Sequence, residues 1–116
     1  MSVEPAAAPH DLAVEVSTDA AGTVTLAVTG EIDVSTSTFL RGRLEEVLDA
    51  EPAAVVVDMA GVPFLDSSGL STLIYAFSRA ERQHATLVVA RPQPIVDRLL
   101  HVTGLFEMLC APAKAQ

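Results

Sequence analysis

Two short, uninterrupted runs of small and β-branched residues constrain the fold of this 116-residue chain more than any other feature. They occupy residues 53–57 and 86–90, and a segment with helical periodicity lies between them. Continuous apolar runs of this length are typical of strands covered on both faces, so we expect both faces to be buried here. Strands that alternate with helices predict right-handed crossovers and a largely parallel sheet with helices packed against it.

Two alternating patterns near the start of the chain predict a β-hairpin. Every second residue is apolar in each pattern, which is the period of a strand with one covered face. The apolar positions are Leu12, Val14 and Val16 in the first strand and Val24, Leu26 and Val28 in the second. Residues 19–22 begin with Asp and end with Gly, so they are expected to form the connecting turn.

Three further segments have the period of amphipathic helices. Their expected inward residues are Phe39, Leu40, Leu44, Val47 and Leu48 in the first, Leu70, Leu73, Ile74 and Phe77 in the second, and Ile95, Leu99 and Leu100 in the third. Ser35, Thr36 and Ser37 are candidate caps of the first helix, and Pro94 and Gly104 bound the third. Leu105, Phe106, Met108 and Leu109 are expected to pack back on the domain.

The length fits a single domain. We expect an α/β fold with a mixed, mostly parallel four-stranded sheet and helices against it, and we find no internal repeat. Residues 11–110 are expected to form the domain. Residues 1–10, which are rich in Ala and Pro, are interpreted as a flexible N-terminal arm, and residues 111–116 as a flexible C-terminal tail.

Charge and composition exclude several classes of function. The net charge of -8 disfavours direct binding to nucleic-acid phosphates and to anionic lipid headgroups. The single cysteine, Cys110, cannot form an internal disulfide, and we expect a half-buried structural thiol. No secretory signal precedes the domain and no apolar run approaches about 18 residues, so the expected location is cytoplasmic, without membrane insertion.

The turn Asp66-Ser67-Ser68-Gly69 joins the run at 53–57 to the second helix and admits two interpretations. In the first, Asp or Ser is an ordinary helix cap that accepts hydrogen bonds from free backbone N–H groups. In the second, an exposed serine at a helix start is accessible to a kinase, and the helix dipole tolerates an added phosphate. Asp33 also has two interpretations, as a cap of the first helix or as an acid beside this turn.

Four segments, taken together and in order, resemble the anti-sigma factor antagonist family, the bacterial members of the STAS domain group. They are Gly30-Glu31-Ile32-Asp33, Val55-Val56-Val57-Asp58, the stretch from Phe64 to Leu70, and Val102-Thr103-Gly104-Leu105-Phe106. The resemblance extends from Leu12 to Leu109 and implies a STAS-like single domain.

The resemblance also implies a function. The unphosphorylated chain would bind an anti-sigma factor, a serine kinase that supplies the ATP, and thereby free a sigma factor. Phosphorylation of Ser67 would reverse the binding, and a serine phosphatase would restore it. By position in the motif, Ser67 is the acceptor rather than Ser68. The implied partner-binding residues are Asp33, Asp66, Ser67, Ser68 and Gly69.

Enzyme chemistry is not expected of this chain. No Gly-x-Ser-x-Gly elbow or phosphate-binding glycine loop occurs, and His10, His84 and His101 lie in separate segments. We therefore predict no catalytic residue, no metal and no cofactor. Phe64, Tyr75 and Phe77 are interpreted as mainly structural. The competing hypothesis is another binding module of the same fold, either a regulatory subunit of a lipid transporter or a scaffold in a stress-signalling complex.

Overall fold

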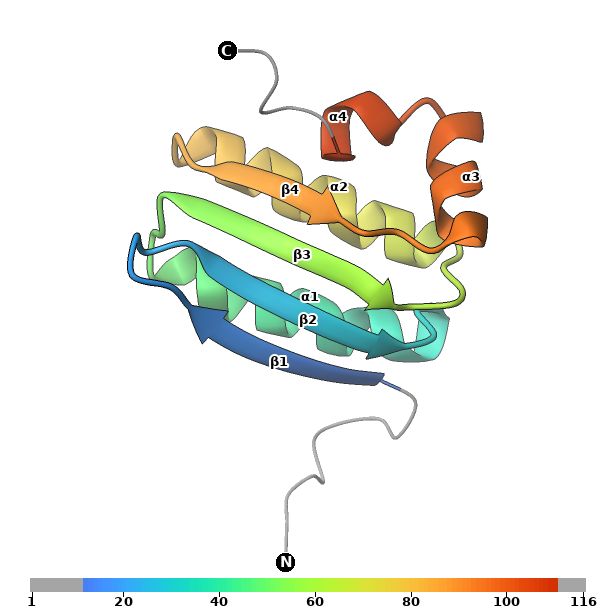
Figure 1. The fold of residues 1–116 in the computed structure, drawn as a ribbon, viewed down its shortest axis with the longest axis horizontal. Helices are drawn as coiled ribbons and strands as arrows, with labels where there is room; N and C mark the ends of the chain where they lie inside the picture. Colours follow the sequence, from blue (N-terminus) through green and yellow to red (C-terminus); the bar gives the residue numbers. More distant parts are fainter. Residues whose placement is uncertain (1–11, 111–116) are drawn as a thin grey trace, which may run out of the picture.

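The computed structural model describes residues 12–110, so the predicted arm (1–10) and tail (111–116) lie outside the described residues. The elements, in chain order, are β1 (Leu12–Thr18), β2 (Val24–Gly30), α1 (Val34–Asp49), β3 (Ala54–Gly61), α2 (Ser67–Arg82), β4 (Thr86–Ala90), α3 (Pro94–Val102) and α4 (Phe106–Cys110) (Figure 1). The predicted order of strands and helices is confirmed, and the short helix α4 is an addition to it.

The four strands form one sheet in the order β1-β2-β3-β4. β1 pairs with β2 in antiparallel fashion, whereas β2–β3 and β3–β4 are parallel, which confirms the expected mixed, mostly parallel sheet. The β1–β2 turn forms as predicted: the Gly22 N–H donates to the Asp19 carbonyl at 3.0 Å, and the Asp19 carboxylate accepts from Ala21 and Thr23. Gly22 has a φ of 90°, which favours glycine at this position.

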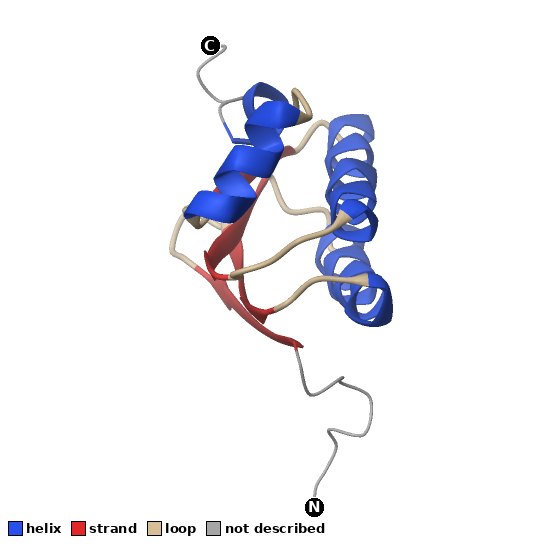
Figure 2. Ribbon diagram, turned by 90° about the vertical axis from the view of Figure 1, so that its right-hand side faces the viewer, coloured by secondary structure: helices blue, strands red, loops and turns tan. Residues whose placement is uncertain are grey.

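The main core lies between the sheet and the pair α1 and α2, which cover the same face (Figure 2). Leu40, Leu44 and Leu48 of α1 are fully buried at a spacing of about one helical turn, against strand residues such as Leu26 and Val57. The chain after β4 also packs back as expected: Leu109 is buried, and Leu105, Phe106 and Met108 are partly buried against the core.

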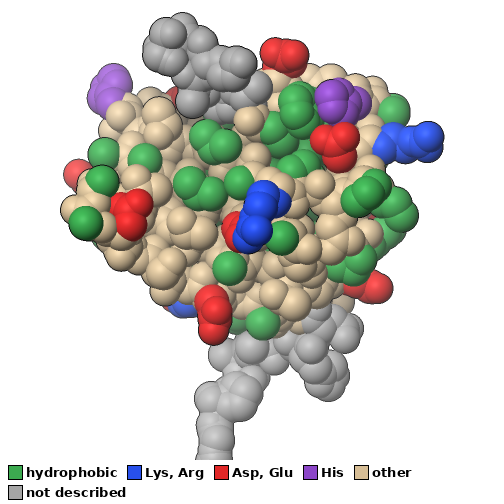
Figure 3. Space-filling model, in the orientation of Figure 1, with side chains coloured by type: hydrophobic (Ala, Val, Ile, Leu, Met, Phe, Trp, Pro, Cys, Tyr) green, Lys and Arg blue, Asp and Glu red, His purple; other side chains and the backbone are tan. Residues whose placement is uncertain are grey.

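The prediction that residues 53–57 and 86–90 are covered on both faces is wrong. Val55 and Val57 are buried, but Val56, which points to the other face, is only half-buried, and so is Val88 of β4. Both crossover helices lie on one side of the sheet, while α3 lies on the other side (Figure 2). Much of that second face is therefore open and carries few charged groups (Figure 3).

Two apolar residues assigned to inward helix faces also point outward. Ile74 of α2 is 36% exposed and Ile95 of α3 is 64% exposed. In α2 the inward face uses small residues such as Ala76 and Ala80, which let the helix lie close to the sheet. In α3 the buried pair is Val96 and Leu100, four residues apart. Within residues 12–110, none of the helices has the length and apolar character needed to cross a bilayer.

Candidate functional site

The candidate site lies at the edge of the sheet where the three parallel strands end. Because β2, β3 and β4 run in the same direction, the segments that follow them meet at this edge, on the right of Figure 1. Ile32 and Leu65 form an isolated parallel bridge there. The loop at 30–33 therefore lies beside the turn before α2, which agrees with the interpretation of Asp33 as an acid beside this turn.

Asp66 is the N-cap of α2. Its carboxylate accepts hydrogen bonds from the backbone N–H groups of Ser68 at 2.9 Å and Gly69 at 3.3 Å, and from the Ser68 hydroxyl at 2.6 Å. The hydrogen bond from the Ser68 side chain is the main reason that the pKa of Asp66 lies below its ordinary value, while the nearby charge of Asp33 opposes this shift. Asp66 is consequently ionised at neutral pH.

Asp33 is the N-cap of α1, which confirms its interpretation as a helix cap, whereas the other candidates, Ser35, Thr36 and Ser37, lie inside the helix. The Asp33 carboxylate accepts from the N–H groups of Ser35 at 2.9 Å and Thr36 at 3.2 Å. In return, the Asp33 N–H donates to the Thr36 hydroxyl at 2.9 Å, so Thr36 takes the position that Glu or Gln holds in most capping boxes. The Ser35 hydroxyl bond is the main cause that lowers the pKa of Asp33.

The two helix starts have the same local design, a short repeat that sequence analysis missed. Residues 32–35 (Ile-Asp-Val-Ser) and 65–68 (Leu-Asp-Ser-Ser) place an Asp cap after a buried aliphatic residue. In each, the serine two positions after the cap donates its hydroxyl to the Asp carboxylate, at 2.8 Å in α1 and 2.6 Å in α2. The matching pattern of aliphatic residue, Asp, any residue and Ser was the available signal. Val34 occupies in α1 the position that Ser67 occupies in α2.

The two neighbouring serines of the turn differ in their surroundings. Ser67 is the first residue of α2 and is exposed, and its hydroxyl makes no hydrogen bond within the described chain. Ser68 is half-buried and its hydroxyl is bound to Asp66. The structure thus leaves one of the two hydroxyls available to solvent.

Gly69 is required by close packing at this edge. A Cβ at this residue would lie 2.3 Å from Cδ1 of Leu65 and 2.8 Å from Cγ2 of Ile32, both well inside van der Waals contact. The small residue lets the first turn of α2 approach the bridge between the two loops. All five residues singled out from the sequence therefore belong to these two adjoining helix starts.

Among the aromatic residues interpreted as structural, Phe64 is an exception. Its side chain is 43% exposed, next to the turn that carries Ser67. Tyr75 does have a structural role, because its hydroxyl donates to Glu45 of α1 at 2.8 Å, and Phe77 packs partly buried against the core. Sequence periodicity did not distinguish Phe64, since it lies in a connection rather than in a helix.

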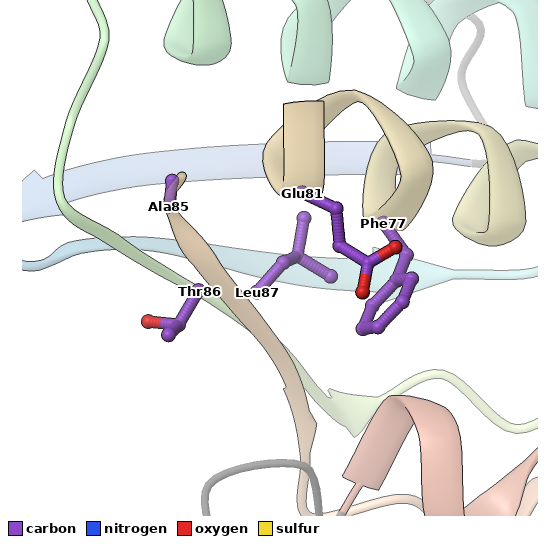
Figure 4. Close-up of a pocket in the computed structure, with 5 residues that line it drawn as sticks. All are labelled: Phe77, Glu81, Ala85, Thr86 and Leu87. Carbon is purple, nitrogen blue, oxygen red and sulfur yellow. The ribbon is translucent and has the colours of Figure 1, made fainter. Parts of the chain in front are cut away.

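A small recess lies toward the other end of α2, where Phe77 and Glu81 face β4 (Figure 4). Ala85, Thr86 and Leu87 complete its lining, and its volume is about 120 Å³. Typical small-molecule sites hold about 300 to 1,000 Å³, so this recess is smaller than a nucleotide would need.

The remaining titratable side chains do not gather at the candidate site. Within residues 12–110, no group of three or more His, Cys, Asp or Glu is arranged to hold a metal ion. His101 stacks on Phe106 with ring centroids 4.1 Å apart, and His10 lies outside the described residues. Cys110 is half-buried as expected, and burial raises the pKa of its thiol to about 11.

Comparison with known proteins identifies the family of the chain. The STAS domain model matches residues 12–115, and the chain belongs to the STAS domain family. Within that family it is similar to anti-sigma factor antagonists. It is 35% identical to the anti-sigma-F factor antagonist RsfB of Mycobacterium tuberculosis, over 84% of this chain and 79% of that protein.

Two further relatives extend the comparison. The crystal structure of an anti-sigma factor antagonist from Mycobacterium paratuberculosis superposes with a TM-score of 0.73 and 30% identity, covering 88% of this chain and 86% of that one. Sulfate transporter 1.2 of Arabidopsis thaliana is 26% identical over 76% of this chain, but only 15% of the transporter is covered. The relatives of this chain thus include both proteins named as anti-sigma factor antagonists and a protein named as a sulfate transporter.

Proposed function

We propose that this chain is an anti-sigma factor antagonist controlled by phosphorylation of Ser67. Its unphosphorylated form binds an anti-sigma factor that is a serine kinase, and the sigma factor held by that kinase is released. The observation that carries the proposal is the contrast between the exposed, unbonded hydroxyl of Ser67 and the Ser68 hydroxyl, which is bound to Asp66 at 2.6 Å. The similarity to named antagonists supports it.

In the proposed reaction this chain contributes only the acceptor. The Ser67 oxygen attacks the γ-phosphorus of ATP held by the kinase, the bond from that phosphorus to the bridging oxygen breaks, and ADP leaves. The hydroxyl proton passes to a base of the kinase. A serine phosphatase then hydrolyses the phosphoserine with water and releases inorganic phosphate. We accordingly assign the chain no catalytic residue, metal or cofactor.

The N-terminus of α2 can accommodate a phosphate on Ser67, and that phosphate changes the charge of the surrounding surface. The N-terminal dipole of α2 favours an added negative charge, so modification is compatible with the fold. The phosphate also adds about 1.5 to 2 negative charges next to the ionised Asp66 and close to Asp33. We propose that Asp33, Asp66, Ser67, Ser68 and Gly69 form the surface that the partner recognises and that this added charge alters.

This role requires the chain to act in the cytoplasm, where bacterial sigma factors bind RNA polymerase. Its contact with transcription is indirect, because a net charge of -8 opposes direct binding to nucleic acid. The kinase and the phosphatase are its proposed partners.

The second candidate function is that of a regulatory subunit of a transporter, such as a lipid transporter. The similarity of the chain to part of a sulfate transporter supports this candidate. A scaffold in a stress-signalling complex would use the same fold. These roles differ from the first in the partner that binds the domain.

Affinity purification from the native host distinguishes these roles. Tagged wild-type and Ser67→Ala chains are each used as bait, and the captured proteins are identified by mass spectrometry. We expect both baits to capture a serine kinase that binds ATP, with more recovered on Ser67→Ala because that bait cannot be phosphorylated. Capture of transporter subunits, with no such kinase, would contradict the proposed function.

A further inference from the structure

Exposed apolar side chains lie at the same edge as Ser67. Val34 is 77% exposed and Phe64 is 43% exposed, and both belong to segments that follow parallel strands. Exposed apolar groups that gather next to a functional group are a feature of protein interaction sites.

Backbone contacts fix these two residues relative to Ser67. The Phe64 carbonyl accepts a hydrogen bond from the Ile32 N–H at 3.0 Å, two residues before Val34. Val34 and Ser67 are the first residues of α1 and α2, which start side by side beyond the bridge between Ile32 and Leu65. Val34 and Phe64 therefore lie on the segments immediately next to the serine.

At this edge the acidic side chains are hydrogen-bonded within the fold, whereas the exposed apolar side chains are not covered by it. The carboxylates of Asp33 and Asp66 each accept three or more hydrogen bonds as helix caps. Much of their hydrogen-bonding capacity is used within the fold. Val34 and Phe64, by contrast, leave large parts of their side chains in water, so their burial by a partner is favourable.

We infer that Val34 and Phe64, here called the apolar clamp, are the main anchors for the anti-sigma kinase, and that a phosphate on Ser67 prevents docking chiefly by its desolvation cost. This inference rests on the proposed function. The complementary surface on the kinase is an apolar patch bordered by Lys or Arg. This follows because the ionised Asp33 and Asp66 flank the apolar clamp in a chain of net charge -8.

The physical reason is that an anion loses much more hydration energy on burial than a hydroxyl does. The unphosphorylated Ser67 can be enclosed by the contact around the clamp at small cost. A phosphoserine at the same place would have to give up its water, and the apolar clamp offers it no hydrogen-bond donor. Simple charge repulsion would be screened by salt, with a Debye length of about 3 Å at 1 M, whereas a desolvation cost at a dry contact would persist.

The test uses the purified host kinase that phosphorylates the wild-type chain. Its dissociation constant is measured for wild type, Val34→Gln and Phe64→Gln, since glutamine adds no new phosphate acceptor. Val102→Gln is the matched control, because Val102 is also 77% exposed but lies at the last residue of α3. We expect Kd to rise about fivefold for Val34→Gln and at least tenfold for Phe64→Gln, while the control stays within about twofold.

Melting temperatures of the variants are measured in parallel, and binding is compared only among chains that are folded at the assay temperature. Unchanged Kd values for both clamp variants would overturn the inference, while continued phosphorylation of the wild-type chain would leave the proposed function intact. If no host kinase phosphorylates the wild-type chain, the proposed function itself fails.

A second measurement tests the desolvation mechanism. The ratio of Kd for the Ser67-phosphorylated chain to Kd for the unmodified chain is determined at about 0.05 M and about 1 M salt. A ratio that changes less than threefold supports desolvation as the main cost. A larger fall at high salt would overturn it in favour of screened repulsion.

Discussion

Ile32 and Leu65 pair as a parallel bridge that joins the loops before the first two helices. The Ile32 N–H donates to the Phe64 carbonyl at 3.0 Å, and the Ile32 carbonyl accepts from the Asp66 N–H at 3.1 Å. Both aliphatic side chains are buried, so the bridge is anchored in the core. It fixes the starts of α1 and α2 relative to one another and brings their two Asp caps to one edge.

This packing predicts that Gly69→Ala destabilises the protein. The new Cβ would collide with Leu65 and Ile32, at 2.3 and 2.8 Å, and overpacking of this kind costs about 1 to 3 kcal/mol. The matched control is Gly42→Ala in α1, where a Cβ meets nothing within 4 Å, and we expect a gain of about 0.5 to 1 kcal/mol there. Urea unfolding measures both, and equal effects would contradict the packing described.

The Asp66 cap predicts a pH-dependent loss of stability for Asp66→Ala. At pH 7 we expect a loss of about 1 kcal/mol, the usual value for an N-cap. Because the folded-state pKa of Asp66 is below the unfolded value of about 3.9, the carboxylate stabilises the fold above that value. The difference between wild type and variant should shrink as the pH falls through the folded-state pKa. A difference that stays constant down to complete acidification would rule out the ionised cap.

The exposure of Ser67 predicts that Ser67→Asp changes binding but not folding. An Asp at the first turn of α2 is compatible with the helix dipole, so circular dichroism and the melting temperature should stay near wild type. Binding to the anti-sigma kinase should weaken, as measured by calorimetry. Equal affinity of the two chains would argue against a charge-dependent switch at this residue.

Ser68→Ala, in contrast to Ser67→Asp, should lower the stability of the fold without preventing phosphorylation. The variant loses the hydroxyl bond to Asp66 at 2.6 Å, and we expect a loss of about 1 kcal/mol in the free energy of unfolding. The cognate kinase should still add one phosphate, because the acceptor is unchanged. A folded Ser68→Ala chain that no longer accepts phosphate would show that Ser68 is the acceptor.

The strands and their order along the chain could be predicted from the sequence, because the period of apolar residues and the chemistry of turns are local properties. The hairpin with Asp19 and Gly22 follows from them. Solvent exposure could not be predicted in the same way, since it depends on which side of the sheet each helix occupies. Val56 and Ile95 are apolar by sequence and yet partly or largely exposed for that reason.

For the candidate site, sequence alone indicated the two Asp residues but not their geometry. Asp33 was one of the candidate caps of α1, but the reciprocal bond from its N–H to the Thr36 hydroxyl could not be predicted, because pattern rules expect Glu or Gln in that position. Phe64 and Val34 carried no periodic signal, because one lies in a connection and the other opens a helix. Phe64 is close to Ser67 along the chain, whereas the proximity of Val34 follows from the parallel pairing of β2 and β3.

The most direct test of the central claim is residue-resolved mass spectrometry of the chain after incubation with its anti-sigma kinase and ATP. We predict a single phosphate on Ser67 of the wild-type chain and none on Ser67→Ala. Phosphate on Ser68 or on any other residue, or undiminished modification of Ser67→Ala, would contradict the account.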